Sequence, residues 1–253
     1  MLWDKLLSLE IYHFLFVFAR LSAAFLFMPF FASKYIPARI RLIFALTLSV
    51  LLTPLLSKLM PPAPESILEL FRLLLIEVTA GLFLGLFPFF LLVAIDLIGT
   101  SASQATSFSN ATAFDPTTNV QSTVLTNFLM LIAILLIVVT NLHHVMLGSV
   151  IASYGLFPPG QALLVGDMTK MLGQTLTTAF NYGFQIGSPF IIMMVLLYSS
   201  MGVMSRLMPQ LNIMFIVMPL QVYLGLALLL ISLPLMMYWF LRYFEDNVRL
   251  FAM

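Results

Sequence analysis

Three ionisable side chains lie within or at the ends of long apolar segments of this 253-residue sequence: Arg20, Glu77 and Asp96. Charged groups at membrane depth are costly, which makes them candidates for ion binding, proton transfer or pairing with one another. No chain of spaced carboxylates indicates a proton relay. We favour an ion pair or polar lock between helices, because an unpaired buried charge is strongly destabilising.

Two adjacent histidines, His143 and His144, are the next candidates for chemistry. Neighbouring residues of a helix point about 100° apart, whereas metal ligands on one helix are typically three or four residues apart. The sequence contains no cysteine, which excludes thiolate metal sites and cysteine nucleophiles, and it has no phosphate-binding loop. We therefore predict no metal site at these residues. We expect a histidine to form a hydrogen bond with a neighbouring helix.

A polar segment over residues 99–121 contrasts with the apolar sequence around it. It is rich in Ser, Thr, Ala and Asn, and it contains no lysine or arginine. Such a segment cannot lie against lipid unless protein or water satisfies its backbone. Two interpretations remain open: a solvated loop, or a re-entrant element that lines or blocks a water-filled path.

These residues must be positioned by a chain that is 62% hydrophobic and only 8% charged. A soluble domain has about 25% charged residues, so the composition indicates a membrane protein. Backbone groups in lipid must satisfy one another, which leaves helices or a closed barrel. The apolar runs are long, continuous and rich in Leu, Met, Ile and Ala, so we predict an all-α fold. The net charge of +1 gives no electrostatic case for nucleic-acid binding.

We predict a single integral membrane domain over residues 1–253. Its elements are about six long, partly broken helices at residues 7–31, 38–56, 66–98, 119–154, 172–204 and 213–244, with a polar loop at 99–118. A helix over 119–154 is about 54 Å long, whereas the hydrocarbon core of a bilayer is about 30 Å thick. We therefore expect helical hairpins, or helices that pack much of their surface on other proteins.

Two Gly-x-x-x-Gly spacings, Gly81 with Gly85 and Gly183 with Gly187, fall within the predicted helices. Small residues at this spacing let two helix backbones approach closely. We expect helix packing there, either within the chain or with partners.

Several motifs follow one another along nearly the whole chain. The first groups are Arg20, Pro29, Ile36-Pro37 and Arg41, then Glu77, Gly81 and Gly85, then Phe108-Ser-Asn-Ala and Phe114-Asp115-Pro116. The next are Asn141, His143, Ser153-Tyr154 and Phe157-Pro158, and then Gly202-x-x-x-Arg206-x-x-Pro209-Gln210-x-Asn212, Pro219, Gln221 and Gly225. This ordered series resembles the FliR/SctT family of type III secretion export-gate proteins, with a lean toward the flagellar branch.

The resemblance implies one copy of the chain beside FliP and FliQ in a helical export-gate assembly, near FlhB and FlhA. It implies a bacterial inner-membrane location in the flagellar basal body, with parts of the complex above the membrane plane on the periplasmic side. The substrates would be exported unfolded proteins, and the chain itself would be no enzyme and would hold no cofactor. The loop before the fourth helix would project into the channel as part of a plug, at the residues Thr106, Ser107, Phe108, Ser109, Asn110, Phe114, Asp115 and Pro116.

We predict a steric mechanism in which Phe108 and Phe114 block the closed pore and Asp115-Pro116 fixes the turn into the next helix. Structural or interface roles are expected for Arg20, Arg41, Glu77, His143, Arg206, Pro209, Gln210 and Asn212, the last four in the sharp connection between the fifth and sixth helices.

Two other functions remain open. One is a transporter of small molecules or ions, since broken helices and intramembrane acids suit that class. The other is a purely structural membrane assembly factor.

Overall fold

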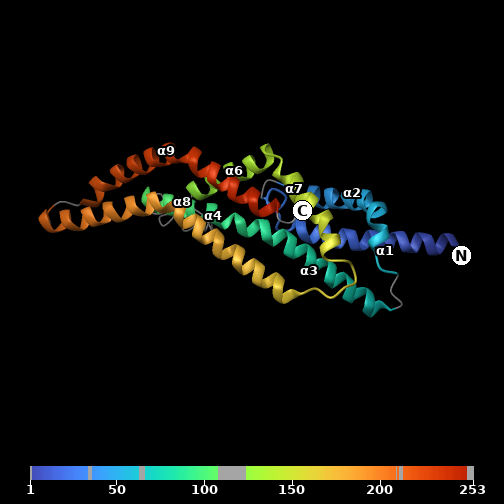
Figure 1. The fold of residues 1–253 in the computed structure, drawn as a ribbon. Coiled ribbons are helices and arrows are strands. Elements are labelled where there is room, and N and C mark those ends of the chain that lie inside the picture. Colours follow the sequence, from blue (N-terminus) through green and yellow to red (C-terminus); the bar gives the residue numbers. More distant parts are fainter. Residues whose placement is uncertain are drawn as a thin grey trace. The chain divides into compact units, whose positions relative to one another are not determined.

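The computed structural model describes residues 2–33, 36–62, 66–107, 124–208, 210 and 213–249. All regular elements in these ranges are helices (Figure 1). They are α1 (Leu2–Phe25), α2 (Ala38–Leu56), the short 3-10 helix η1 (Ser57–Leu59), α3 (Ile67–Leu91), α4 (Val93–Ala105), α6 (Val124–Val139), α7 (Leu142–Leu156), α8 (Val165–Leu207) and α9 (Ile213–Arg249). The predicted all-α class is confirmed.

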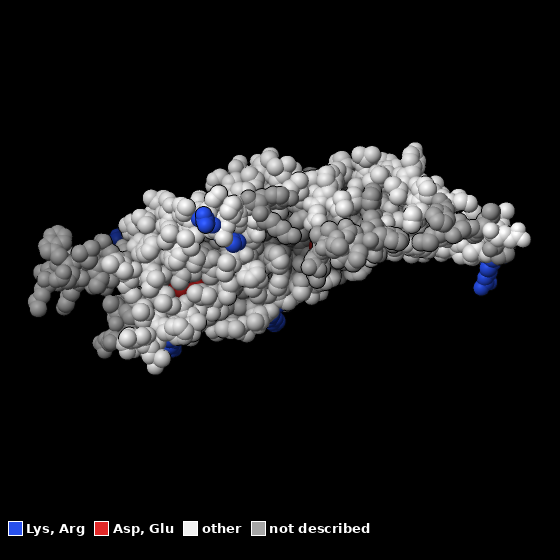
Figure 2. All heavy atoms as spheres, turned by 180° about the vertical axis from the view of Figure 1, so that it is seen from behind, with Lys and Arg blue, Asp and Glu red and all other residues white. Residues whose placement is uncertain are grey.

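Several helices are suited to a membrane by length and composition. In the described ranges, four helical segments are long and apolar enough to cross a bilayer: Ala38–Leu59, Ile67–Ala105, Val165–Leu207 and Ile216–Arg249. The bent pair α6 and α7 would make a fifth span. Figure 2 shows that the face it draws is mostly uncharged, with scattered lysine and arginine side chains. The predicted membrane character is therefore confirmed.

The chain forms two compact units, which are described separately. The first comprises Met1–Leu91, Ile137–Thr175 and Phe244–Met253, and the second comprises Leu92–Leu136 and Leu176–Tyr243. Within the first unit, α1 packs against both α2 and α3, and α3 also contacts α7. Gly81 and Gly85 of α3 lie directly on the backbone of α1, at Arg20 and Ala24, where no side chain would fit. The first Gly-x-x-x-Gly spacing therefore brings two helices of this chain together.

The short helix α4 has close neighbours on several sides in the second unit. A Cβ added at Gly183 of α8 would lie 3.0 Å from the carbonyl oxygen of Ala94, and Gly187 faces Ile98 and Ser101 at ordinary contact distance. A Cβ added at Gly99 of α4 itself would lie 2.6 Å from the Cα of Thr126 on α6. The second Gly-x-x-x-Gly spacing thus also brings two helices of this chain together, α8 and α4.

The first helix ends earlier than the sequence indicated. We predicted a helix to residue 31, but α1 ends at Phe25 and the chain continues in turns, with Phe30 at a φ of 74°. Pro29 explains the difference, because a proline disfavours helical backbone at the residue before it. The rings of Phe25, Phe31 and Phe44 stack over this turn, so buried aromatic packing stabilises the break.

The predicted helix over 119–154 is broken in the described structure. α6 and α7 meet at an angle of 71°, and Asn141 between them has a left-handed φ of 60°. Asparagine adopts this conformation more readily than most residues. The polar interruption at Thr140 and Asn141 is therefore an elbow.

The predicted polar loop at 99–118 is wrong for its first residues, because α4 continues to Ala105. Its hydroxyl groups bond back to carbonyls one turn earlier: Thr100 to Asp96 at 2.8 Å and Ser101 to Leu97 at 2.9 Å. Serine and threonine residues whose hydroxyl groups donate to carbonyl oxygens of their own helix are compatible with that helix. The polar composition alone suggested a loop.

Three further helix boundaries differ from the sequence prediction. The third predicted helix is interrupted at Leu92, one turn after Pro88. α8 begins at Val165, seven residues before the predicted start, and α9 continues to Arg249. α8 is 43 residues long, about 65 Å, so it exceeds the thickness of a bilayer by about twofold.

Candidate functional site

The polar segment predicted to form a plug begins at the end of α4. Thr106 and Ser107 are its first members and are described by the structure. The other predicted members lie outside the described residues: Phe108, Ser109, Asn110, Phe114, Asp115 and Pro116. The geometry at Thr106 and Ser107 therefore defines where and how the segment leaves the helix.

Thr106 is fully buried and packs against α9. Its hydroxyl donates a hydrogen bond to the carbonyl oxygen of Ala102 at 2.9 Å, which closes the last turn of α4. Its methyl group lies against Gly225, so closely that a Cβ at that position would collide with it. Only a glycine at residue 225 allows this approach.

Ser107 makes the second contact with α9. Its side-chain hydroxyl is hydrogen-bonded to Oε1 of Gln221, and both residues are buried. Its φ of 58° is in the left-handed region, which is unusual for a serine. Gln221 and Gly225 are four residues apart and therefore share one face of α9. We call the four residues Thr106, Ser107, Gln221 and Gly225 the clasp.

No role was predicted for Gln221 or Gly225 from the sequence, although both belong to the motifs of the resemblance. Their spacing of four residues on one helix was the available signal. It did not identify the partner, because more than a hundred residues separate them from Ser107.

A second polar cluster lies inside the first unit. Arg20 of α1 forms an ion pair with Glu77 of α3, with Nε to Oε2 at 2.7 Å and Nη2 to Oε1 at 3.1 Å. Nη1 donates to the hydroxyl of Ser153 at 3.1 Å, and Nη2 also donates to the carbonyl oxygen of Phe157 at 2.9 Å. The guanidinium carbon lies 3.9 Å from the ring centre of Tyr154. We call these residues the polar lock.

The charged side chains of the polar lock are buried, and most of their hydrogen-bonding groups have partners. The side chains of Arg20 and Glu77 are 0% and 1% exposed. The bidentate geometry uses both carboxylate oxygens, and the remaining guanidinium bonds go to α7 and the residue that follows it. The lock therefore joins α1, α3 and α7, and its charges are engaged with each other rather than with a ligand.

The other predicted residues are dispersed. Arg41 is half-buried on α2, whereas Asp96, Arg206 and Gln210 are exposed. Pro209 and Asn212 lie outside the described residues. No group of three histidine or acidic side chains that could hold a metal occurs in the part of the chain that the structure describes.

His143 lies at the start of α7. Its Nδ1 atom is buried and has no hydrogen-bond partner among the described residues. The ring instead lies 6.2 Å from the ring of Phe30 and 4.1 Å from that of His144, measured between centroids. The ring of His143 thus packs against aromatic neighbours, and the hydrogen bond expected for one of the two histidines stays a prediction.

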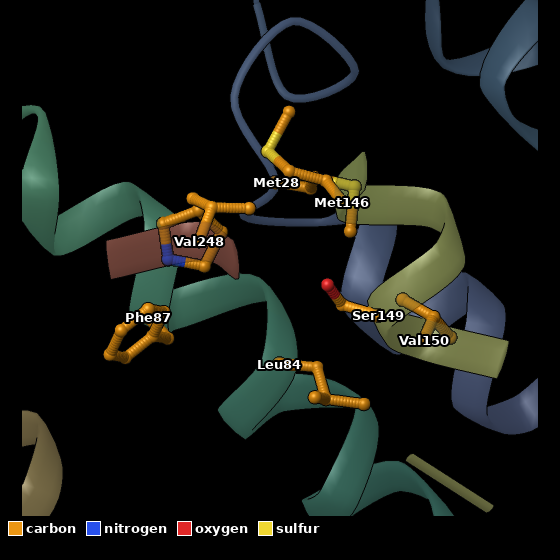
Figure 3. Close-up of a pocket in the computed structure, with 8 residues that line it drawn as sticks. Met28, Leu84, Phe87, Met146, Ser149, Val150 and Val248 are labelled. Atoms are coloured by element: carbon orange, nitrogen blue, oxygen red, sulfur yellow. The ribbon is translucent and has the colours of Figure 1, made fainter. Parts of the chain in front are cut away.

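A small cavity in the first unit is lined almost entirely by apolar side chains (Figure 3). Its volume is about 20 Å³, and its lining comprises Met28, Leu84, Phe87, Pro88, Met146, Ser149, Val150 and Val248. A space of this size holds about one water molecule. The hydroxyl of Ser149 already donates to the carbonyl oxygen of Val145 at 2.9 Å. This cavity is therefore a packing defect and too small for a transported solute.

The chain matches bacterial proteins along most of its length. The family described as bacterial export proteins, family 1, matches residues 11–247. A flagellar biosynthetic protein FliR of Caulobacter vibrioides is 33% identical over 239 residues, which are 94% of this chain and 95% of that protein. Proteins of the same name from Bacillus subtilis and Escherichia coli are 28% and 25% identical. These matches cover 87% and 99% of this chain, and 85% and 94% of the two relatives.

Proposed function

We infer the function of this chain from its family, because it belongs to the bacterial export proteins of family 1. We propose that it is a subunit of the flagellar type III protein export gate and is required for flagellum assembly. The observation that carries this proposal is the match over 94% of the chain to a protein named for flagellar biosynthesis. The apolar helices support a location in the bacterial inner membrane, within the flagellar basal body.

We propose that the chain acts as one integral membrane domain in a complex with FliP and FliQ type subunits, as a single copy near FlhB and FlhA type proteins. The long helices support a role as an assembly subunit. Only 11% of the most apolar window of α8 and 22% of that of α9 are buried within the chain. A bilayer covers about 30 Å of a helix, so a 43-residue helix needs protein partners for much of its remaining apolar surface. Parts of the complex would then stand above the membrane plane on the periplasmic side.

We further propose a steric role without enzymatic chemistry. The polar segment that follows α4 forms part of a plug in the export channel, with Phe108 and Phe114 as its bulky residues. Displacement of this segment opens the path for unfolded protein substrates. The clasp supports this role because it fixes the base of the segment on α9.

The test uses a flagellated bacterium that lacks its own family member and expresses this chain together with its neighbouring subunits. The intact chain should restore swimming and the export of hook protein. Removal of residues 108–113 should leave the complex assembled and increase the leakage of small ions across the membrane. If the complex with the shortened segment assembles and the leakage of small ions stays normal, the proposed plug is contradicted. A failure of the intact chain to support any export contradicts the proposed function.

A further inference from the structure

A row of neutral polar side chains runs along α8. It comprises Asn181, Gln185 and Ser188, which follow one another at spacings of four and three residues. Residues at these intervals share one face of a helix. All of them are exposed except Ser188, which is half-buried. We call this set the polar row.

The polar row faces away from the packed side of the helix. Gly183 and Gly187 follow Asn181 and Gln185 by two residues, which is about 200° around a helix. Both glycines are buried, and they contact α4. The second unit therefore leaves Asn181 and Gln185 uncovered on the opposite side.

Lipid is a poor environment for these side chains. Transfer of an amide group from water to hydrocarbon without a hydrogen-bond partner is unfavourable. The hydroxyl of Ser188 donates to the carbonyl oxygen of Gln185 at 2.8 Å. Within the described residues, the side-chain amides of Asn181 and Gln185 form no hydrogen bond. Water or a polar polypeptide can supply hydrogen-bond partners for these exposed amides.

The length of α8 allows the polar row to lie away from lipid. Beyond Pro189 the same face first carries the apolar Ile192 and Leu196, exposed by 59% and 63%, and then the exposed Ser199 and Arg206 nearer the end of the helix. The part of α8 from Pro189 to Leu207 is about 28 Å long, which is enough to cross the hydrocarbon core. The N-terminal half of the helix, which carries the row, is not needed for that span.

The chemistry of the polar row fits an extended polypeptide. Amide and hydroxyl groups both donate and accept hydrogen bonds, so they can exchange water for the backbone of any sequence. The row contains no charged residue that would select or retain charged segments. We propose that the polar row lines the water-filled export path and contacts unfolded polypeptide in transit. This proposal rests on the proposed function.

The absence of native cysteine from the chain permits a direct test in the assembled complex. Single variants Asn181→Cys and Gln185→Cys are treated in intact membranes with a charged maleimide that does not cross lipid, and labelling is measured on the isolated chain. Phe184→Cys is the matched control, because residue 184 lies at the same level of the helix and its native side chain is 54% exposed. The two row positions should react about ten-fold faster than the control, since the thiolate forms in water.

The second arm adds an export substrate fused to a tightly folded domain that stalls in the channel. The stalled chain should slow labelling of both row positions by about five-fold through exclusion of the reagent. Slow labelling equal to that of Phe184→Cys overturns the proposal, because the row then faces lipid or a partner. Fast labelling without protection also overturns it, because the row then faces solvent outside the path. Hook-protein export by the same strains shows separately whether the proposed function holds.

Discussion

The polar lock and the clasp solve the same problem, joining distant segments of the chain, with different chemistry. The polar lock uses a fully buried ion pair with two bonds between Arg20 and Glu77, and further bonds to a third helix. The clasp uses one neutral hydrogen bond and one close contact at a glycine. Charge-assisted bonds are about twice as strong as neutral ones. We therefore expect the joint in the first unit to be the stronger of the two.

Loss of one partner from the polar lock should have the largest effect. Arg20→Ala or Glu77→Ala leaves a buried charge unpaired, which costs about 3–5 kcal/mol of folding stability. We expect little folded chain in the membrane, measured as the amount of protein that survives extraction in mild detergent. The double variant Arg20→Met with Glu77→Leu removes both charges and should recover much of the loss. A single variant that is as stable as the unchanged chain contradicts the assignment of the stronger joint to the polar lock.

Substitution at the clasp glycine should have the next largest effect. Gly225→Ala places a methyl group on Thr106, and overpacking of this kind costs about 1–3 kcal/mol. We expect an assembled complex with increased ion leakage, measured by dye or conductance assays. Gly148→Ala is the control, because nothing lies within 4 Å of a Cβ at that exposed helical position. Equal leakage from the two variants would show that Gly225 does not set the position of the segment.

The neutral hydrogen bond of the clasp should contribute less. Ser107→Ala and Gln221→Ala each remove one partner, and a neutral bond contributes about 1 kcal/mol. In a double-mutant cycle the two changes should be coupled by a similar amount, because they remove the same interaction. Thermal unfolding in detergent measures the coupling. Strictly additive effects would mean that the two side chains act independently.

The exposed ion pair near the end of α9 provides the smallest expected effect. Nη2 of Arg249 lies 2.7 Å from Oε1 of Glu245, but the two side chains are 58% and 41% exposed. Exposed pairs of this kind contribute at most about 1 kcal/mol. Arg249→Ala should leave the yield of folded chain and the export of hook protein unchanged. A loss as large as that of Arg20→Ala would show that burial is not what distinguishes the polar lock.

The sequence predicted the class of the fold because that class depends on composition. Long uncharged runs are sufficient to indicate membrane helices, whichever residues contact one another. Both Gly-x-x-x-Gly spacings also indicated helix packing, since the small side chain is itself the cause of the close approach. These features are local, and they need no knowledge of the partner helix.

The contacts of the candidate sites could not be predicted in the same way. Arg20 and Glu77 are separated by 57 residues, and the apolar sequence between them does not specify which helices meet. The continuation of α4 to Ala105 was missed because serine and threonine indicate loops by composition. Their hydrogen bonds to carbonyls one turn earlier become visible only in three dimensions.

The hydrogen bonds of Thr100 and Ser101 to their own helix have a consequence for the way in which α4 folds. The last two turns of α4 are rich in polar side chains, so their average hydropathy is low. Yet Thr100 and Ser101 have their hydroxyls bonded to the helix's own backbone. A newly made helix of this kind hides much of its polarity before any other helix has arrived. Packing of other helices on α4 therefore does not need to supply hydrogen bonds for these two hydroxyl groups.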